Sequence, residues 1–252
     1  MARFGNKSII VTGAASGIGR ATAQAFAAEG GHVLLADRNG PGAEDAAEAI
    51  RGNGGTAIAM AVDVSDFAQC EAMVARAVEA HGGLDIAFNN AGISGSLSAK
   101  IHELPLEDWQ AMMAVNLTGV FHCIKAEVPA MLARGGGAIV NTSSAAGLIG
   151  GPGISAYVAA KHGVAGLTKA AALDLIKDNI RVNAVCPGAI RTGMLDTAFA
   201  IPEVRARLEA DHPIGRVAEA DEVARLVLFL ASEEASFMVA TCVPVDGGMI
   251  AQ

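Results

Sequence analysis

The chain has 252 residues, of which 52% are apolar, and a formal net charge of −8. It is long and apolar enough for an α/β domain with a sizeable core, which excludes a disordered chain. The acidic balance, with no run of basic residues, argues against a partner that is nucleic acid or an anionic membrane surface. A small molecule is the expected partner.

Short apolar runs alternate with longer amphipathic, alanine-rich runs from end to end, as is typical of repeated β-α units around a parallel sheet. Seven strands are expected, at 8–12, 32–36, 56–62, 84–89, 137–143, 180–186 and 242–245. Helices are expected at about 17–29, 42–53, 67–81, 106–133, 155–177 and 220–231. The sequence therefore predicts an α/β fold over residues 1–252, with one Rossmann-type, doubly wound, seven-stranded parallel sheet.

The segment 192–216 departs from this alternation and follows the sixth strand, where loops overhang the ligand crevice of such sheets. We expect it to form a small substrate lid.

The cysteines and the N-terminal segment indicate the cellular compartment in which the protein is expected. The cysteines form no C-x-x-C pair and no histidines stand at metal-ligand spacing, so neither a disulfide framework nor a metal site is predicted. The N-terminus reaches the first strand without an apolar signal segment, and no uncharged stretch is long enough to span a bilayer. A soluble cytoplasmic protein with reduced thiols is expected.

A glycine-rich turn follows the first strand and opens the first helix, in the run Gly13-Ala14-Ala15-Ser16-Gly17-Ile18-Gly19. Gly13 permits a sharp turn, Gly17 lets the backbone approach a pyrophosphate, and Gly19 allows tight helix packing. The spacing G-x-x-x-G-x-G is one residue longer at its first gap than the generic dinucleotide fingerprint. A purely structural β-α turn would also explain these glycines.

Asp37 ends the second strand, where a carboxylate can accept hydrogen bonds from both ribose hydroxyls and would repel a 2′-phosphate. Ser16 stands just before Gly17, where a basic residue would offset such a phosphate. NAD is therefore favoured over NADP. Arg38 keeps the alternative open, because its guanidinium could accommodate a phosphate, stack on adenine or face solvent.

Asp63 and Val64 close the third strand, which would bring them near the adenine. A helix cap by Ser65 or Asp66, with Asp63 merely in the turn, explains this segment equally well.

Tyr157 is the only tyrosine and stands four residues before Lys161 in an expected helix. Residues at this spacing share a helix face, so the phenol and the ammonium would point into the same space. An unperturbed tyrosine titrates near ~10, and a cation at hydrogen-bonding range would lower its pKa toward neutrality. The pair indicates proton transfer, although Tyr-x-x-x-Lys also arises by chance.

Taken together, these motifs resemble the short-chain dehydrogenase/reductase family over essentially the whole chain. The turn at 12–19 resembles the family's cofactor turn, and Asn89-Asn90-Ala91-Gly92 its fourth-strand signature. Asn116 resembles the catalytic asparagine, and Ser144, thirteen residues before Tyr157, the catalytic serine. The downstream matches are Asn183, Pro187, Gly188, Ile190, Thr192 and the run Val245-Asp246-Gly247-Gly248.

The resemblance implies hydride transfer between nicotinamide and a carbinol or carbonyl carbon, with Tyr157 as general acid and base. Lys161 would lower the pKa of Tyr157 and bind the nicotinamide ribose. Ser144 would hold and polarise the substrate oxygen, whereas Ser143 would face the other side of the strand. The carbonyl of Asn116 would hold a water that connects Lys161 to solvent, although packing alone would also explain this asparagine.

The resemblance also implies contacts with the cofactor further along the chain. Thr192 would bind the nicotinamide carboxamide, and Asn90 and Gly92 would line the ribose side, although Asn90 also suits backbone support at a strand end. The other implied cofactor contacts are Ala91, Pro187, Gly188 and Ile190. We assign no catalysis to the histidines, which are expected to cap helices or face solvent: His81, His102, His122, His162 and His212.

The expected substrate walls are mainly small and apolar. Besides Ser144 and Tyr157, they include Ser94, Ala145, Ile154 and Met194. This composition favours a hydrophobic or cyclic secondary alcohol or ketone as substrate.

Two other functions are compatible with the same motifs, and the resemblance also bears on the oligomeric state. A 3-oxoacyl-[acyl-carrier-protein] reductase is disfavoured by Asp37 and by the stretch 131–139, which carries only Arg134 as a basic residue for an acidic carrier. A catalytically silent NAD-binding sensor or assembly protein is disfavoured by the complete set of four catalytic residues. The resemblance also implies a homotetramer.

Overall fold

A seven-stranded parallel sheet forms the centre of the molecule in the computed structural model, which describes residues 2–95, 99–193 and 199–252. The strand order is β3-β2-β1-β4-β5-β6-β9, and every pairing is parallel. The strands are β1 (Ser8–Thr12), β2 (His32–Asp37), β3 (Thr56–Ala61), β4 (Ile86–Asn89), β5 (Gly137–Thr142), β6 (Ile180–Pro187) and β9 (Cys242–Val245). All seven predicted strands are confirmed, with ends that shift by at most two residues.

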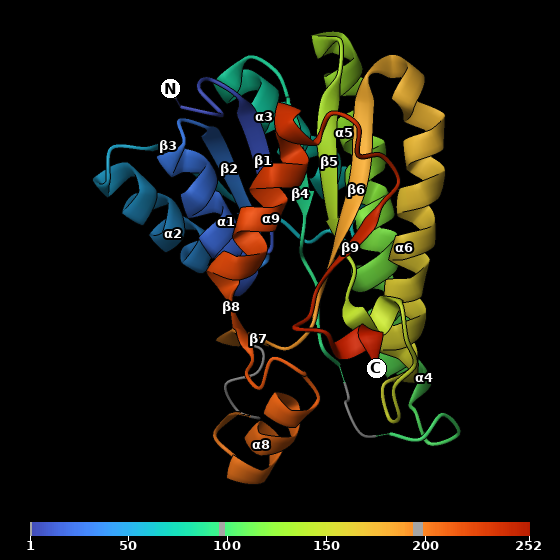
Figure 1. Cartoon of the computed structure of the whole chain (residues 1–252). Coiled ribbons are helices and arrows are strands. Elements are labelled where there is room, and N and C mark those ends of the chain that lie inside the picture. The colour runs from blue at the N-terminus through green and yellow to red at the C-terminus, as the bar shows by residue number, and fades with distance from the viewer. Residues whose placement is uncertain (1, 96–98, 194–198) are drawn as a thin grey trace.

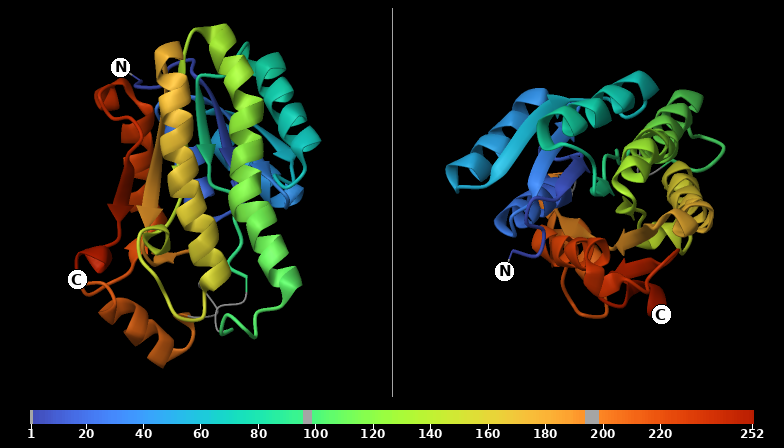
Figure 2. Two further views of the ribbon diagram at one scale, coloured as in Figure 1. Left: turned by 90° about the vertical axis from the view of Figure 1, so that its right-hand side faces the viewer. Right: turned by 90° about the horizontal axis from the view of Figure 1, so that it is seen from above.

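Helices cover both faces of this sheet (Figure 1). On one face lie α1 (Gly17–Ala28), α2 (Gly40–Gly52) and α9 (Ala220–Ala231). On the other lie α3 (Phe67–His81), α5 (Gly119–Arg134) and α6 (Ser155–Leu175), and α5 and α6 run side by side on the outside (Figure 2). The predicted single α/β domain is confirmed.

The sequence of β1 explains why this strand lies in the middle of the sheet. All five of its residues are buried. Ile9 and Val11 belong to the apolar cluster with Phe26 of α1, whereas Ile10 belongs to the cluster with Met73 of α3. Alternate residues of a strand point to opposite faces, so a strand covered on both faces must be apolar throughout.

The long helix expected at 106–133 is interrupted. The structure has α4 (Leu106–Met113), a π-helical turn (Ala114–Thr118) and then α5. A π-turn shifts the backbone hydrogen bonds by one residue, and such turns are frequent at functional sites. Asn116 lies in the middle of this turn.

The segment after β6 contains elements that the sequence did not predict. β7 (Ile190–Arg191) and β8 (Ala218–Glu219) form a separate two-stranded parallel sheet, and α8 (Pro202–Ala210) lies between them in the chain. This helix projects beyond the carboxyl ends of the central strands (Figure 1). Within the expected lid at 192–216, residues 194–198 lie outside the described residues, and closure of the lid stays a prediction.

Candidate active site

The predicted catalytic and cofactor residues converge at the carboxyl ends of β1, β4, β5 and β6. The strand order reverses between β1 and β4, the topological switch point where doubly wound sheets bind ligands. The glycine-rich turn follows β1, Asn90 follows β4, and α6 carries Tyr157 and Lys161 beside the end of β5.

The glycine-rich turn is built so that only glycines fit at its critical positions. Gly13 and Gly17 have φ of +66° and +52°, in the left-handed region that favours glycine. A Cβ on Gly13 would lie 2.9 Å from the Cα of Ala91, and one on Gly17 would lie 2.9 Å from Cγ2 of Thr192. A Cβ on Gly19 would overlap the carbonyl oxygen of Gly13. The first two residues of α1 after this turn are half-buried, and the backbone N–H groups at a helix N-terminus suit a pyrophosphate.

Asn90 supports this turn from β4. Its amide N–H donates to Oγ1 of Thr12 at 2.9 Å, and its Nδ2 donates to the carbonyl of Thr12 at 3.1 Å. The hydroxyl of Thr142 donates to its Oδ1 at 3.3 Å. The side chain thus ties the end of β4 to β1 and β5, in the structural role that the sequence left open.

Asp37 stands at the end of β2 with its carboxylate turned toward the glycine-rich turn. Oδ2 accepts the N–H of Ala15 at 3.0 Å and Oδ1 accepts the N–H of Asn39 at 2.8 Å. Asp37 is half-buried, and the neighbouring Arg38 is exposed to solvent. The orientation of Asp37 suits a ribose that sits on the turn.

Asp63 and Val64 take part in structural contacts. The carboxylate of Asp63 accepts the hydroxyl of Ser65 at 2.7 Å and its N–H at 2.9 Å, and these bonds lower the pKa of Asp63. Asp66 caps α3 by accepting the N–H of Ala68. Val64 is buried in the core. The turn and the helix cap are therefore both present, and proximity of Asp63 and Val64 to the adenine stays a prediction.

Tyr157 and Lys161 share a face of α6, as their spacing predicts. The ammonium of Lys161 lies 5.7 Å from the centre of the Tyr157 ring and donates to the carbonyl of Thr142 at 2.8 Å. Burial lowers the pKa of Lys161 to about 8, with Cys186 acting in the opposite direction. This lysine is 4% exposed, so the loss of hydration dominates its titration.

The expected fall in the pKa of Tyr157 is wrong for the protein alone. Burial raises the pKa of Tyr157, and a hydrogen bond with the hydroxyl of Ser144 only partly opposes that rise. The physical reason is that the Lys161 ammonium is directed at the Thr142 carbonyl, so desolvation of the phenolate outweighs attraction to the cation.

The two neighbouring serines have the different roles that alternation along a strand predicts. The hydroxyl of Ser143 donates to the backbone carbonyl of Lys161 at 2.8 Å and is buried. The hydroxyl of Ser144 accepts the N–H of Ala146 and donates to the carbonyl of Pro187 at 3.4 Å, a long bond. Ser144 can therefore turn toward a substrate oxygen at little cost.

Asn116 uses its side chain to hold the segment after β4. Its Oδ1 accepts the N–H of Ile93 and its Nδ2 donates to the carbonyl of Ile93, both at 2.8 Å. A Cβ on Gly92 would lie 3.2 Å from that Oδ1. The side chain thus has the packing role that the sequence left open, while the π-turn around it alters the main-chain bonding of the same residue.

The predicted cofactor segment after β6 also lies at this end of the sheet. Pro187 ends β6, Ile190 begins β7, and the methyl group of Thr192 contacts Gly17 of the glycine-rich turn. His212 is buried against Gly188, and its Nδ1 lies 2.6 Å from the carbonyl of Leu208 in the last turn of α8, so the expected helix-capping role is confirmed for this residue. Its burial and its contact with Gly188 are not predictable from local sequence, because these neighbours come from distant segments.

The predicted substrate residues surround the catalytic groups only in part. Ser94 and Ile154 are half-buried and Ala145 is buried, whereas Met194 lies outside the described residues. Tyr157 packs in a small apolar cluster on this side of the molecule, with Met112, Ile93, Leu104, Met113, Leu117, Ala156 and Ala160. The side chains near the phenol are thus predominantly apolar.

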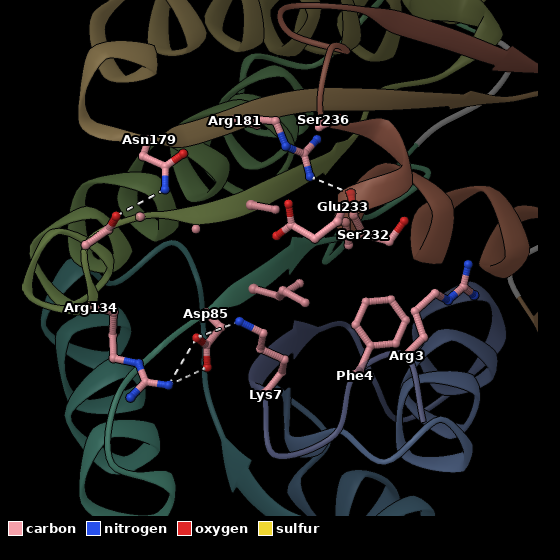
Figure 3. Close-up of a pocket in the computed structure, with 16 residues that line it drawn as sticks. Arg3, Phe4, Lys7, Asp85, Arg134, Asn179, Arg181, Ser232, Glu233 and Ser236 are labelled. Carbon is pink, nitrogen blue, oxygen red and sulfur yellow. Dashed lines mark hydrogen bonds and ion pairs between the residues drawn. The ribbon is translucent and has the colours of Figure 1, made fainter. Parts of the chain in front are cut away.

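A cavity of about 240 Å³ lies at the opposite, amino end of the strands (Figure 3). Lys7 and Arg134 both pair with Asp85, at 3.5 Å and 3.1 Å, and Arg181 donates to the carbonyls of Leu230 and Ser232 at the end of α9. These cations neutralise a buried carboxylate and complement helix C-termini. We therefore do not assign the catalytic site to this cavity.

The described part of the chain carries neither a metal-binding cluster nor a membrane-spanning helix. Within the described residues, no group of three or more histidine, cysteine or acidic side chains is placed to hold a metal ion. The four cysteines are free thiols, three of them buried. In the same part of the chain, no helix is long and apolar enough to cross a membrane.

The fold and this site define an oxidoreductase that uses a nicotinamide dinucleotide, and comparison with known proteins agrees. A family model described as enoyl-(acyl carrier protein) reductase matches residues 13–250. The cyclohexanol dehydrogenase of Acinetobacter sp. (strain SE19) is 45% identical over 97% of this chain and 95% of its own. The 2,5-dichloro-2,5-cyclohexadiene-1,4-diol dehydrogenase of Sphingobium indicum (strain UT26) is 44% identical over 100% of both chains.

Solved structures agree with these relatives. The crystal structure of levodione reductase matches with a TM-score of 0.94 and 38% identity, over 99% of both chains. The chain belongs to the short-chain dehydrogenase/reductase family.

Proposed function

We propose that this chain interconverts a hydrophobic or cyclic secondary alcohol and the corresponding ketone, with NAD as the hydride carrier. The observation that carries the proposal is the convergence of Ser144, Tyr157 and Lys161 beside the glycine-rich turn, at the carboxyl end of the sheet. A protein that binds the dinucleotide without catalysis would need the glycine-rich turn but not these three side chains.

Each catalytic side chain has a role that its surroundings support. Bound NAD supplies the site that accepts the hydride. The hydroxyl of Ser144 holds the substrate oxygen, and the Oη of Tyr157 takes the alcohol proton in oxidation and returns it in reduction. Lys161, buried and directed at the Thr142 carbonyl, binds the nicotinamide ribose and supplies positive charge near the phenolate.

The apolar cluster around Tyr157 supports a hydrophobic substrate. A relative named cyclohexanol dehydrogenase supports a cyclic one. For an acyl-carrier substrate, the guanidinium of Arg134 would have to serve as a landing site, but it is paired with Asp85 at the amino end of the sheet, away from Tyr157. The cyclic alcohol is therefore the better-supported substrate.

Initial rates across a panel of secondary alcohols test the substrate. Cyclohexanol-type and aryl-alkyl alcohols should give a higher kcat/KM than polyols and simple sugars. A panel in which sugars exceed every cyclic alcohol would contradict the proposal, as would reduction of 3-oxoacyl thioesters that exceeds reduction of all cyclic ketones.

The preference for NAD rests on Asp37. Its carboxylate borders the turn and would repel a 2′-phosphate, whereas the exposed Arg38 could attract one. Asp37→Ser should lower kcat/KM with NAD and raise it with NADP, which changes the ratio by at least about tenfold. Glu48→Ser, an exposed carboxylate on α2, is the matched control. A wild type that prefers NADP would overturn the assignment.

We also infer a homotetramer in the cytoplasm. Phe121 and Leu132 on α5 are 45% and 46% exposed, and Leu173 on α6 is 71% exposed, which is unusual for large apolar side chains on two adjacent helices. The unpaired thiols agree with a reducing compartment.

A further inference from the structure

His212 bonds through both ring nitrogens to main-chain atoms of two different segments. It follows α8, and only 4% of it is exposed. The N–H of Ala189 donates to Nε2 at 3.0 Å, so Nε2 carries no proton. Nδ1 lies 2.6 Å from the carbonyl of Leu208 and is therefore the donor. The ring is a neutral imidazole with its single proton on Nδ1.

The Ala189 N–H belongs to the segment that we assign to the nicotinamide. Gly188 lies so close to the ring that a Cβ on it would be 2.5 Å from Nε2. On the other side, Ile190 pairs with Ala218 in the small sheet, and Thr192 contacts Gly17 of the glycine-rich turn. A contiguous set of contacts thus joins the end of α8 to the cofactor turn.

We infer that His212 is a positioning residue for the cofactor. Its neutral Nε2 holds the Ala189 N–H, and so fixes the segment from Pro187 to Thr192 in the orientation that receives the nicotinamide. This inference rests on the proposed function. An aromatic ring without nitrogens would fill the same space but would remove the acceptor of the half-buried Ala189 N–H, which costs the hydrogen bond and part of the desolvation of that group.

Three substitutions separate the hydrogen bond from packing. His212→Gln places a carbonyl oxygen near the position of Nε2 and so keeps an acceptor for Ala189. His212→Asn is too short to reach Ala189, although its amide can still donate near Leu208. His212→Phe keeps the ring and removes both bonds. For each purified full-length variant, the Kd for NADH is measured by fluorescence, together with Tm, kcat and the KM for NAD.

His212→Phe and His212→Asn should raise the Kd for NADH and the KM for NAD about tenfold, equivalent to about 1.4 kcal/mol. His212→Gln should stay within about threefold of the wild type, and kcat should change less than KM. Equal NADH binding by all variants would overturn the inference. So would a Gln variant as weak as the Phe variant, because the acceptor would then be irrelevant. Failure of the wild type to bind NADH would instead refute the proposed function.

Amide hydrogen exchange provides a second measurement if the Phe and Asn variants do not fold. The Ala189 N–H should be protected from exchange in the wild type and in His212→Gln, because both offer it an acceptor. An Ala189 N–H that exchanges in the wild type as fast as an exposed amide would overturn the inference.

Discussion

Tyr157 has its pKa set by two opposed effects. Burial raises it, and a hydrogen bond with the hydroxyl of Ser144 partly opposes that rise. Lys161 alone does not reverse the effect of burial, because its ammonium is held by the Thr142 carbonyl. The positive charge of oxidised nicotinamide would have to supply the remaining decrease in the pKa of Tyr157. Proton transfer would then depend on cofactor binding.

This balance gives a spectroscopic prediction. Ultraviolet titration of the single tyrosine should give a pKa above ~10 in the protein alone and a lower value in the NAD complex. Tyr157→Phe should lower kcat/KM by about 10²–10⁴-fold. The same titration of Lys161→Met should show a smaller fall with NAD. An unchanged pKa in the complex, or turnover that survives in the Phe variant, would refute the general-base role.

At the scale of elements, the glycine-rich turn and the segment after β6 depend on each other. Gly17 has φ of +52°, and its α-carbon faces the methyl group of Thr192. The small β7–β8 sheet holds Thr192 in this place through Ile190. The cofactor site is thus formed by contact between two elements that lie far apart in sequence.

Gly17→Ala should therefore disrupt both elements. The left-handed φ costs about 1–2 kcal/mol for an alanine, and the new Cβ would lie 2.9 Å from Thr192. We expect the Kd for NADH to rise at least about tenfold and Tm to fall by several degrees. Gly52→Ala is the control, because nothing lies within 4 Å of its added Cβ. If Gly17→Ala binds NADH like Gly52→Ala, the turn is only structural.

At the scale of the whole molecule, a buried polar chain links β4, β5, α5 and α6. Nδ2 of Asn89 donates to Oε2 of Glu127 and to Oδ1 of Asn141, and Nδ2 of Asn141 donates to the hydroxyl of Thr168. Glu127 is fully buried, and burial raises its pKa to about 8. Glu127 Oε1 and Asn89 Oδ1 have no partner within the described chain.

Glu127 should make stability depend on pH. Its pKa is raised from 4.5 to about 8 on folding, so between these values the folded chain holds a proton that the unfolded chain has released. The free energy of unfolding should therefore fall by about 1.4 kcal/mol per pH unit in this window and level off above it. In denaturant unfolding, Glu127→Gln should lose this pH dependence of the free energy of unfolding. Glu48→Gln, which changes an exposed carboxylate, should keep it. Parallel curves for Glu127→Gln and the wild type would show that Glu127 is ionised in the fold.

The outer face of α5 and α6 makes the oligomeric state testable. Native mass spectrometry or light scattering should give four times the mass of the 25.4 kDa chain. Leu173→Glu should lower that mass, because it places a charge on an apolar side chain that we infer to be covered. A monomeric wild type would exclude the tetramer.

Local pattern sufficed to predict the parallel sheet, the glycine-rich turn and the spacing of Tyr157 and Lys161. Covered parallel strands must be apolar, positive φ requires glycine at Gly13 and Gly17, and a four-residue spacing fixes one helix face. Only the tertiary structure decided the π-turn at Asn116, the raised pKa of Tyr157, the neutral ring of His212 and the buried acid of Glu127. Each depends on burial and on partners from distant segments, because the cost of removing a polar group from water is set by everything packed around it.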